Sequence, residues 1–169
     1  MIVRQETSGD YDEVYGLVKE AFASAEHSDG NEHDLVAALR KSAAFVPELS
    51  LVAEADGKIV GHILFTEATV GGDTVLALAP LSVLPTYQKT GVGTALMEKG
   101  HRIARELGYS YSVVLGSETY YPRVGYAPAD GFGIEVPEGV PPENYMAIKL
   151  QEDAAPVAGT VAYAEEFGM

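Results

Sequence analysis

The sequence predicts an α/β protein built on a mixed, mostly antiparallel sheet that helices cover. Three strand-like segments, 51–55, 59–70 and 74–84, follow one another with only tight turns between them, so they should pair antiparallel. A helix-like segment, 91–107, then separates them from a strand at 110–115. Because a helical crossover joins parallel strands, that last pair should be parallel, and the sheet is therefore mixed.

The N-terminal part predicts one short strand and two helices. Residues 2–5 form the strand, and the helices cover 10–23 and 32–40, with a polar loop at 27–30 between them. Apolar residues recur at helical spacing in both segments. We expect Pro47 to end this region.

The segment 74–84 carries apolar residues on both faces, so it should be a central strand covered on both sides. Pro80 lies within it, and a proline cannot donate a hydrogen bond to a neighbouring strand. The sequence therefore predicts a local break in strand pairing at Pro80, which leaves backbone groups that a ligand can use.

The rest of the chain predicts further elements of the same domain. A helical turn should run from Gly116 to Gly125, and Gly108 should end the helix before it. Strand candidates in the C-terminal part are 132–136, 145–150 and 160–163. We expect a single domain over residues 1–169, with a C-terminal extension from about 130 to 169 packed on it.

Composition excludes several classes of site and partner. The 169 residues include no cysteine, which rules out disulfides, cysteine-bound zinc and a thiol acyl-enzyme. The net charge of −14 repels phosphate backbones, so nucleic acid is not an expected partner; it either attracts cations or simply solubilises the surface. No signal peptide or membrane span is evident, and we expect a cytoplasmic monomer or homodimer.

The segment between the strand 74–84 and the following helix has the composition of an anion-binding loop. It reads Gln88-Lys89-Thr90-Gly91-Val92-Gly93-Thr94, and glycines at a helix start let a ligand approach the backbone. Unpaired N–H groups and the helix dipole attract an anion such as a pyrophosphate. A Walker A loop needs a glycine-lysine-serine/threonine ending, which is absent here, and a dinucleotide fingerprint is contradicted by Leu96 and Gly116. A glycine-tolerant helix start without a ligand is the plain alternative.

The segment 81–96 resembles the acetyl-CoA signature of the GNAT acetyltransferases, whose core is Q/R-x-x-G-x-G/A. Gln88, Gly91 and Gly93 match that core. The segments 51–54, 61–65, 114–117, 120–126 and 159–163 are similar to the YhbS-like branch of the family, so the resemblance covers nearly the whole chain.

The resemblance implies a GNAT fold with helices on both faces of the sheet and a bulged fourth strand that splays from the fifth. The pantetheine arm of acetyl-CoA would lie in that gap, and the pyrophosphate would rest on backbone N–H groups from Lys89 to Thr94. No metal is expected. The implied cosubstrate-binding residues are Leu81, Ser82, Val83, Gln88, Lys89, Thr90, Gly91, Val92, Gly93 and Thr94.

The implied reaction is acetyl transfer to a primary amine of a small molecule or peptide by direct attack in a ternary complex. By resemblance, Tyr121 takes the position of the general acid beside the sulfur, while Tyr120 should point elsewhere; a buried structural tyrosine is the alternative for Tyr121. An alkylammonium ion has a pKa near ~10.4, so a base or a water leading to one must take its proton. His62, Glu67 and Glu118 are candidates for that base, although such residues are more often surface or packing residues.

Two further hypotheses concern the N-terminal helices, which form the acceptor wall in this family. Acidic residues are frequent there, which predicts a cationic acceptor or, more plainly, a solvated acidic face: Asp10, Asp12, Glu13, Glu20, Glu26, Asp29, Glu32 and Asp34. His27 and His33 near Asp29 and Asp34 could suggest a metal site, but a polar loop is the favoured interpretation. The rival functions are a non-catalytic acyl-CoA-binding or sensing module and an interaction protein that keeps only the fold.

Overall fold

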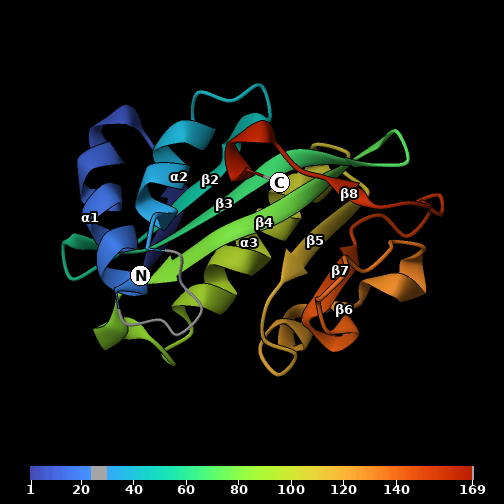
Figure 1. Ribbon diagram of the computed structural model, residues 1–169. Helices are drawn as coiled ribbons and strands as arrows, with labels where there is room; N and C mark the ends of the chain where they lie inside the picture. Colours follow the sequence, from blue (N-terminus) through green and yellow to red (C-terminus); the bar gives the residue numbers. More distant parts are fainter. Residues whose placement is uncertain (24–29, 169) are drawn as a thin grey trace.

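One eight-stranded sheet organises the protein, as seen in a computed structural model that describes residues 1–23 and 30–168 (Figure 1). The strand order is β1-β2-β3-β4-β5-β7-β6, and β8 pairs with β3. Among the strands of the described residues only β4 and β5 pair parallel, and the other strand pairs are antiparallel, so the predicted mixed, mostly antiparallel sheet is confirmed. The strands are β1 Ile2–Gln5, β2 Phe45–Ala55, β3 Lys58–Val70, β4 Asp73–Val83, β5 Tyr111–Leu115, β6 Ala127–Pro128, β7 Tyr145–Lys149 and β8 Val161–Ala162.

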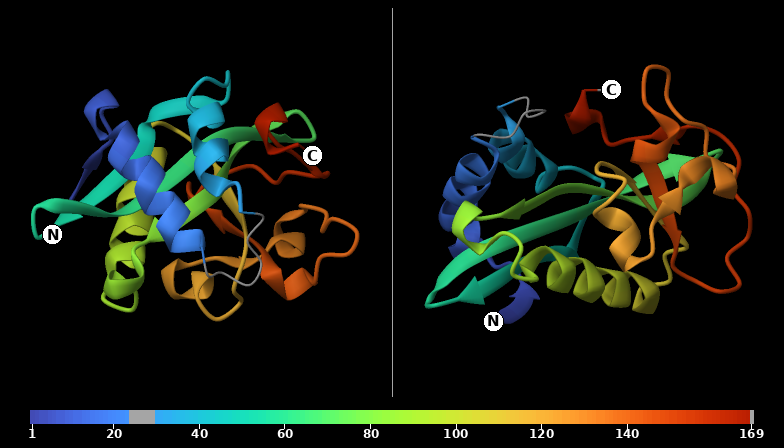
Figure 2. Two further views of the ribbon diagram at one scale, coloured as in Figure 1. Left: turned by 60° about the vertical axis from the view of Figure 1, so that its left-hand side comes forward. Right: turned by 90° about the horizontal axis from the view of Figure 1, so that it is seen from below.

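Helices cover both faces of this sheet (Figure 2). Helix α1 (Tyr11–Phe22) packs on β3 and β4, and α2 (Glu32–Leu39) lies beside it on the same face. Helix α3 (Val92–Glu106) covers the opposite face, where its Gly100 lies against the Phe65 ring of β3. Within the described residues, no helix is long and apolar enough to cross a membrane.

The pairing break expected at Pro80 is present as a β-bulge. Ile63 of β3 faces Leu81, whereas Phe65 faces Leu78, so β4 has one extra residue in the segment that contains Pro80. On its other edge, β4 pairs with β5 only at Leu76 and Ala77. Beyond Ala77 the two strands separate, and the backbone edge of β4 that faces β5 no longer has a strand neighbour.

Two expectations about secondary structure are wrong. Pro47 does not precede a strand but lies within β2, where residues 46–49 stand opposite Phe65 alone; the missing N–H is tolerated because this stretch is not regularly paired. Residues 132–136 do not form a strand. The chain makes a 3₁₀ turn over Ala129–Phe132, Gly133 has a left-handed φ of 89°, and only Ile134 bridges to Gly159. The two-residue strand β6 carried no periodic signal and was not expected.

The core consists of two apolar clusters. The larger lies between the sheet and the three helices, and the smaller lies around β5, β7 and the C-terminal segment. In the smaller cluster Tyr145 of β7 is almost fully buried, and its hydroxyl lies 2.7 Å from that of Tyr163. The C-terminal segment therefore packs against the same sheet as the rest of the described chain.

Candidate functional site

A cavity of about 650 Å³ opens beside the part of β4 that has separated from β5. Its walls come from the end of β4, the loop before α3, the first turn of α3 and the segment after β5. It is lined by Leu81, Val83, Tyr87, Gln88, Lys89, Gly91, Gly93, Thr94, Thr119, Tyr120, Tyr121 and Arg123. Segments that are distant in the sequence thus meet at one hollow, and most of the residues chosen from the sequence are there.

The loop before α3 has a backbone shape that few sequences adopt. Lys89 and Gly91 both have positive φ, at 63° and 93°, and Gly91 is the left-handed residue that caps α3. A glycine adopts this conformation without strain, which explains the residue type at position 91. The amide of Gln88 donates to the carbonyl of Val83 over 3.3 Å, which ties the loop to β4. The N–H groups of the first turn of α3 have no partners within the helix and so can bind an anion.

The charge of the cavity differs from that of the chain as a whole. Lys89 and Arg123 line it, and no carboxylate is among the described residues that do so, although the net charge of the protein is −14. Arg123 follows β5 on the 3₁₀ turn η3 (Tyr121–Val124), where its Nε donates to the carbonyl of Thr119. This local excess of positive charge favours an anionic ligand. The sequence reasoning missed Arg123, although it stands two residues after Tyr121.

Three residues chosen from the sequence do not line the cavity with their side chains. Val92 is buried and points toward Gly61 in the core. Thr90 is exposed and donates its hydroxyl to the carbonyl of Tyr87. Ser82 is buried and stands opposite His62 on the neighbouring strand. Contacts from these residues to a ligand in the cavity would have to come from the backbone.

Two adjacent tyrosines, Tyr120 and Tyr121, line the cavity from the segment that follows β5. The Tyr121 ring packs closely over Gly116 and makes edge-on contacts with Tyr120 and Tyr126 at centroid distances of 5.1 and 5.8 Å. Burial raises the pKa of Tyr121 to about 12, so its hydroxyl keeps its proton at neutral pH. Tyr120, expected to point elsewhere, lines the same cavity with its hydroxyl against Gly93. Gly93 therefore accommodates Tyr120, a reason for glycine that the sequence motif did not reveal.

The three candidate bases occupy different environments, and none is among the residues that line the cavity. Glu67 accepts a hydrogen bond of 2.5 Å from the Tyr109 hydroxyl, and it faces Leu76, where β4 is still paired with β5. Glu118 is exposed and accepts from the Asn144 amide over 2.7 Å. His62 is fully buried, and burial lowers its pKa to about 4.

Several of the N-terminal acidic residues are occupied by contacts within the protein. Asp10 forms an ion pair with Arg4 at 2.8 Å, Glu13 accepts from the backbone N–H of Ile59, and Asp34 accepts from the Tyr15 hydroxyl. Asp12 and Glu20 are exposed. Glu26, His27 and Asp29 lie outside the described residues. Among the residues that the structure does describe, no group of three His, Asp or Glu side chains could hold a metal ion.

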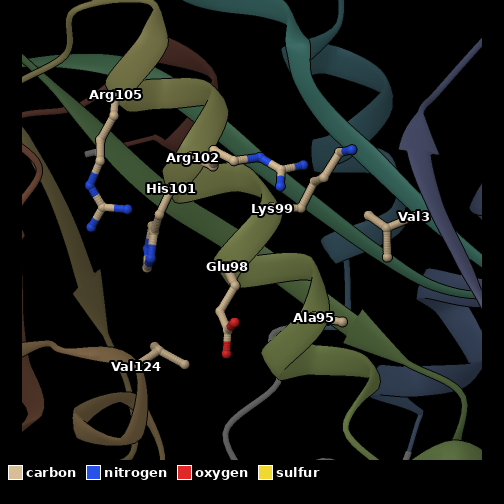
Figure 3. Close-up of a pocket in the computed structure, with 8 residues that line it drawn as sticks. All are labelled: Val3, Ala95, Glu98, Lys99, His101, Arg102, Arg105 and Val124. Carbon is tan, nitrogen blue, oxygen red and sulfur yellow. The ribbon is translucent and has the colours of Figure 1, made fainter.

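A second hollow, of about 600 Å³, runs along the outer side of α3. Figure 3 shows that its side chains leave the helix in two directions: Lys99 and Arg102 extend toward Val3, whereas His101 and Arg105 extend to the other side. Because these groups do not converge, the cavity beside β4 is the better candidate site.

Comparison with known proteins agrees with this choice of site. The model of the acetyltransferase (GNAT) family matches residues 11–126, which include the loop before α3 and both tyrosines. The chain belongs to the GNAT family. The uncharacterized N-acetyltransferase YjhQ of Escherichia coli K12 is 45% identical over 125 residues, which cover 71% of this chain and 69% of YjhQ. YhbS of the same strain is 29% identical over 171 residues, covering 99% of this chain and 98% of YhbS.

Solved structures of GNAT proteins have the same fold over almost the whole chain. The crystal structure of Escherichia coli YhbS in complex with CoA matches with a TM-score of 0.88 and 28% identity, covering 99% of this chain and 92% of that one. A GNAT acetyltransferase from Brucella melitensis in complex with acetyl-CoA matches with a TM-score of 0.81 and 31% identity, over 98% and 97% of the two chains. The expected family and fold are confirmed: this protein is a GNAT-family N-acetyltransferase.

Proposed function

We propose that this GNAT protein transfers the acetyl group of acetyl-CoA to a primary amine of a small molecule or peptide, by direct attack of the amine on the thioester in a ternary complex. The observation that carries the proposal is the cavity beside β4, which combines an unpaired strand edge, an anion-binding helix start and a half-buried neutral tyrosine. A thiol acyl-enzyme is impossible because the chain has no cysteine.

Both the pantetheine arm and the pyrophosphate of acetyl-CoA match groups that border this cavity. The amides of its pantetheine arm can extend the sheet by pairing with the free backbone edge of β4 from Leu81 to Val83. Its pyrophosphate matches the N–H groups at the start of α3, with Lys89 and Arg123 supplying positive charge. In support, the relatives from Escherichia coli and Brucella melitensis carry CoA and acetyl-CoA on the same fold.

Tyr121 is our choice for the group that assists the leaving thiolate. Within the described part of the chain its hydroxyl makes no hydrogen bond, so it is available to a ligand in the cavity. A pKa of about 12 makes it a weak proton source for a thiol whose pKa is near ~8.5. We therefore expect Tyr121 to donate a hydrogen bond to the developing negative charge rather than to lose its proton completely.

We propose a cationic acceptor, and a single catalytic domain over residues 1–169. The exposed carboxylates of Asp12 and Glu20 on α1 support the cationic acceptor, but Asp10, Glu13 and Asp34 contribute less because they already bind groups of the protein. The inclusion of β7 and β8 in the central sheet supports the single domain.

The test is release of free thiol from acetyl-CoA with spermidine, kanamycin, a lysine peptide and n-butylamine as acceptors, beside calorimetric titration with acetyl-CoA. We expect binding, and thiol release with at least one cationic amine at a kcat/KM well above that of n-butylamine. n-Butylamine has no charge besides its reacting ammonium group, whose pKa is near ~10.4. Equal kcat/KM values at low salt for n-butylamine and for the acceptors with further positive charges would therefore remove the cationic preference. Binding without release from any amine would favour the acyl-CoA-binding module instead.

Two variants connect the test to the cavity. Gly91→Asp should abolish acetyl-CoA binding, because it strains a backbone with a φ of 93° and places a negative charge beside the pyrophosphate. Tyr121→Phe should lower kcat about 10-fold or more and leave acetyl-CoA affinity nearly unchanged, because the hydroxyl acts on the leaving group. An unchanged kcat would remove Tyr121 from this role.

A further inference from the structure

A chain of buried polar side chains crosses the face of the sheet opposite α3. It begins at Arg40, whose Nε and Nη2 donate to the two carboxylate oxygens of Glu6 at 3.1 and 2.6 Å. The hydroxyl of Ser50 donates to the same carboxylate over 2.8 Å, and its oxygen lies 3.0 Å from Nε2 of His62. The side chains of Glu6 and His62 are 2% and 0% exposed, so water does not compete for these contacts.

The hydrogen-bond donors along this chain determine which nitrogen of His62 carries a proton. A carboxylate only accepts, so the single hydroxyl hydrogen of Ser50 belongs to Glu6. The Ser50 oxygen must then accept from His62, which places the hydrogen of the imidazole on Nε2. Because burial lowers the pKa of His62 to about 4, the ring is neutral at pH 7, and its Nδ1 presents a lone pair.

His62 lies on β3, beside the strand that borders the cavity. Nδ1 of His62 and Oγ of Ser82 are both buried, and neither has a hydrogen-bond partner in the described part of the chain. The two residues stand directly opposite each other on β3 and β4, so their side chains share one face of the sheet. Ser82 lies between Leu81 and Val83, both of which line the cavity. Buried polar groups are normally paired, so two adjacent unpaired groups at this position call for a functional explanation.

We propose that Ser82 and His62 form the proton relay that receives the proton of the attacking amine. This inference rests on the proposed acetyl transfer. As the C–N bond forms and the C–S bond breaks, the amine proton passes through a water to Ser82 Oγ, whose side chain does not itself line the cavity. The hydroxyl proton of Ser82 passes to His62 Nδ1 once these two groups, which are not hydrogen-bonded to each other in this structure, come within hydrogen-bond distance. CoA leaves as a thiolate, and the imidazolium then returns one proton to it, so the products are the amide, CoA thiol and an unchanged relay.

The electrostatics determine when this transfer can occur. Glu6, 3.7 Å from Nε2, stabilises the imidazolium, whereas burial and the charge of Arg40 oppose it. So weak a base does not deprotonate a free alkylammonium ion, whose pKa is near ~10.4. It can accept the proton once the C–N bond is forming, because the nitrogen loses its basicity as it becomes an amide nitrogen. The relay therefore acts on an amine that binds in its neutral form.

The chain also provides a matched control. In the described part of the chain, Thr66 also has a buried side-chain atom without a partner, its Oγ1, and it lies on the same face of β3 as His62. It is four residues further along, about 13 Å at the usual rise of a strand. There it faces Ala77, where β4 and β5 still pair. Loss of this hydroxyl should affect packing as much as loss of the Ser82 hydroxyl, but it should not affect the relay.

The first experiment needs no turnover. In protein with ¹⁵N-labelled histidine, long-range ¹H–¹⁵N spectra report the tautomer of each ring, and His62→Gln assigns the signal. We expect His62 to be neutral with its hydrogen on Nε2 at pH 7, and its Nδ1 shift to change in Ser82→Ala but not in Thr66→Val. The relay would be overturned by a hydrogen on Nδ1, or by a ¹⁵N chemical shift of Nδ1 that is the same in Ser82→Ala as in the wild type.

The second experiment measures kcat with the amine that gives the highest kcat/KM in the panel above. Ser82→Ala and His62→Gln should each lower kcat about 100-fold, the usual lower limit for general acid–base catalysis, and Ser82→Thr should restore most of it. Acetyl-CoA affinity should be unchanged in Ser82→Ala, because only the backbone at position 82 is expected to contact the arm. Full kcat in Ser82→Ala, or an equal loss in Thr66→Val, contradicts the relay. A wild-type protein that binds acetyl-CoA and shows the expected tautomer but acetylates no amine contradicts the proposed function instead.

Discussion

Gly93 offers a sharp test of how the cavity is built. A Cβ atom at this position would lie 2.0 Å from the hydroxyl oxygen of Tyr120 and 3.3 Å from the ring carbon that bears it. Since ordinary contact begins at 3.4 Å, Gly93→Ala forces the hydroxyl to retreat by roughly 1.4 Å. The Tyr120 ring contacts Tyr121 edge-on at a centroid distance of 5.1 Å, so it cannot move without disturbing the second tyrosine.

Two opposing effects determine the magnitude. Overpacking of this kind costs about 1–3 kcal/mol, while alanine is favoured over glycine in a helix interior by at most about 1 kcal/mol. Gly93→Ala should therefore lower the free energy of unfolding by about 1 kcal/mol and weaken acetyl-CoA binding about 10-fold or more. Tyr120→Phe removes the clashing oxygen and leaves the nearest ring atom at 3.3 Å, so the double variant should recover most of both losses.

The assays are urea unfolding and calorimetric titration with acetyl-CoA, with Gly16→Ala as the control. Gly16 is exposed within α1, and a Cβ there would meet nothing within 4 Å, so this variant should gain about 1 kcal/mol. If Gly93→Ala gains stability as Gly16→Ala does and binds acetyl-CoA normally, the close packing of Tyr120 on Gly93 is refuted.

Two further predictions concern buried charge. The pKa values of His62 and His101 lie at about 4 in the folded protein, below the usual 6.5, so the unfolded state binds more protons and stability should fall as the pH drops from about 6.5 toward 4. Each histidine should cost about 2 kcal/mol by pH 5; urea unfolding at pH 7.5 and 5 would show this, and a His101→Gln variant with an unchanged pH dependence would contradict it. Arg40→Met leaves the Glu6 carboxylate buried without its cation and should lose about 3–5 kcal/mol; a loss below 1 kcal/mol in the same assay would show that Glu6 is not held by that pair.

Much of the fold was predictable because it depends on local patterns. Apolar spacing located the three helices and the long strands, and tight turns at Asp56–Gly57 and Gly71–Gly72 defined the antiparallel order. Pro80 indicated the bulge in β4, because a missing N–H disrupts strand pairing in any context. The prediction of a strand at 132–136 was wrong although apolar residues alternate there. Gly133 lies between them, and its left-handed backbone interrupts the extended conformation.

The candidate site, too, was predictable from the sequence only in part. The loop before α3 was visible in the sequence, because its glycines and the free N–H groups of a helix start are properties of one short segment. Which side chains surround it was not: the contact of Tyr120 with Gly93 and the pairing of His62 with Ser82 join residues 20 or more positions apart. Such contacts depend on strand register, and a shift of one residue would turn His62 to the other face of the sheet. The sequence by itself therefore determined the family, the main elements and the anion-binding loop, whereas only the tertiary structure decided which polar groups face one another in the core.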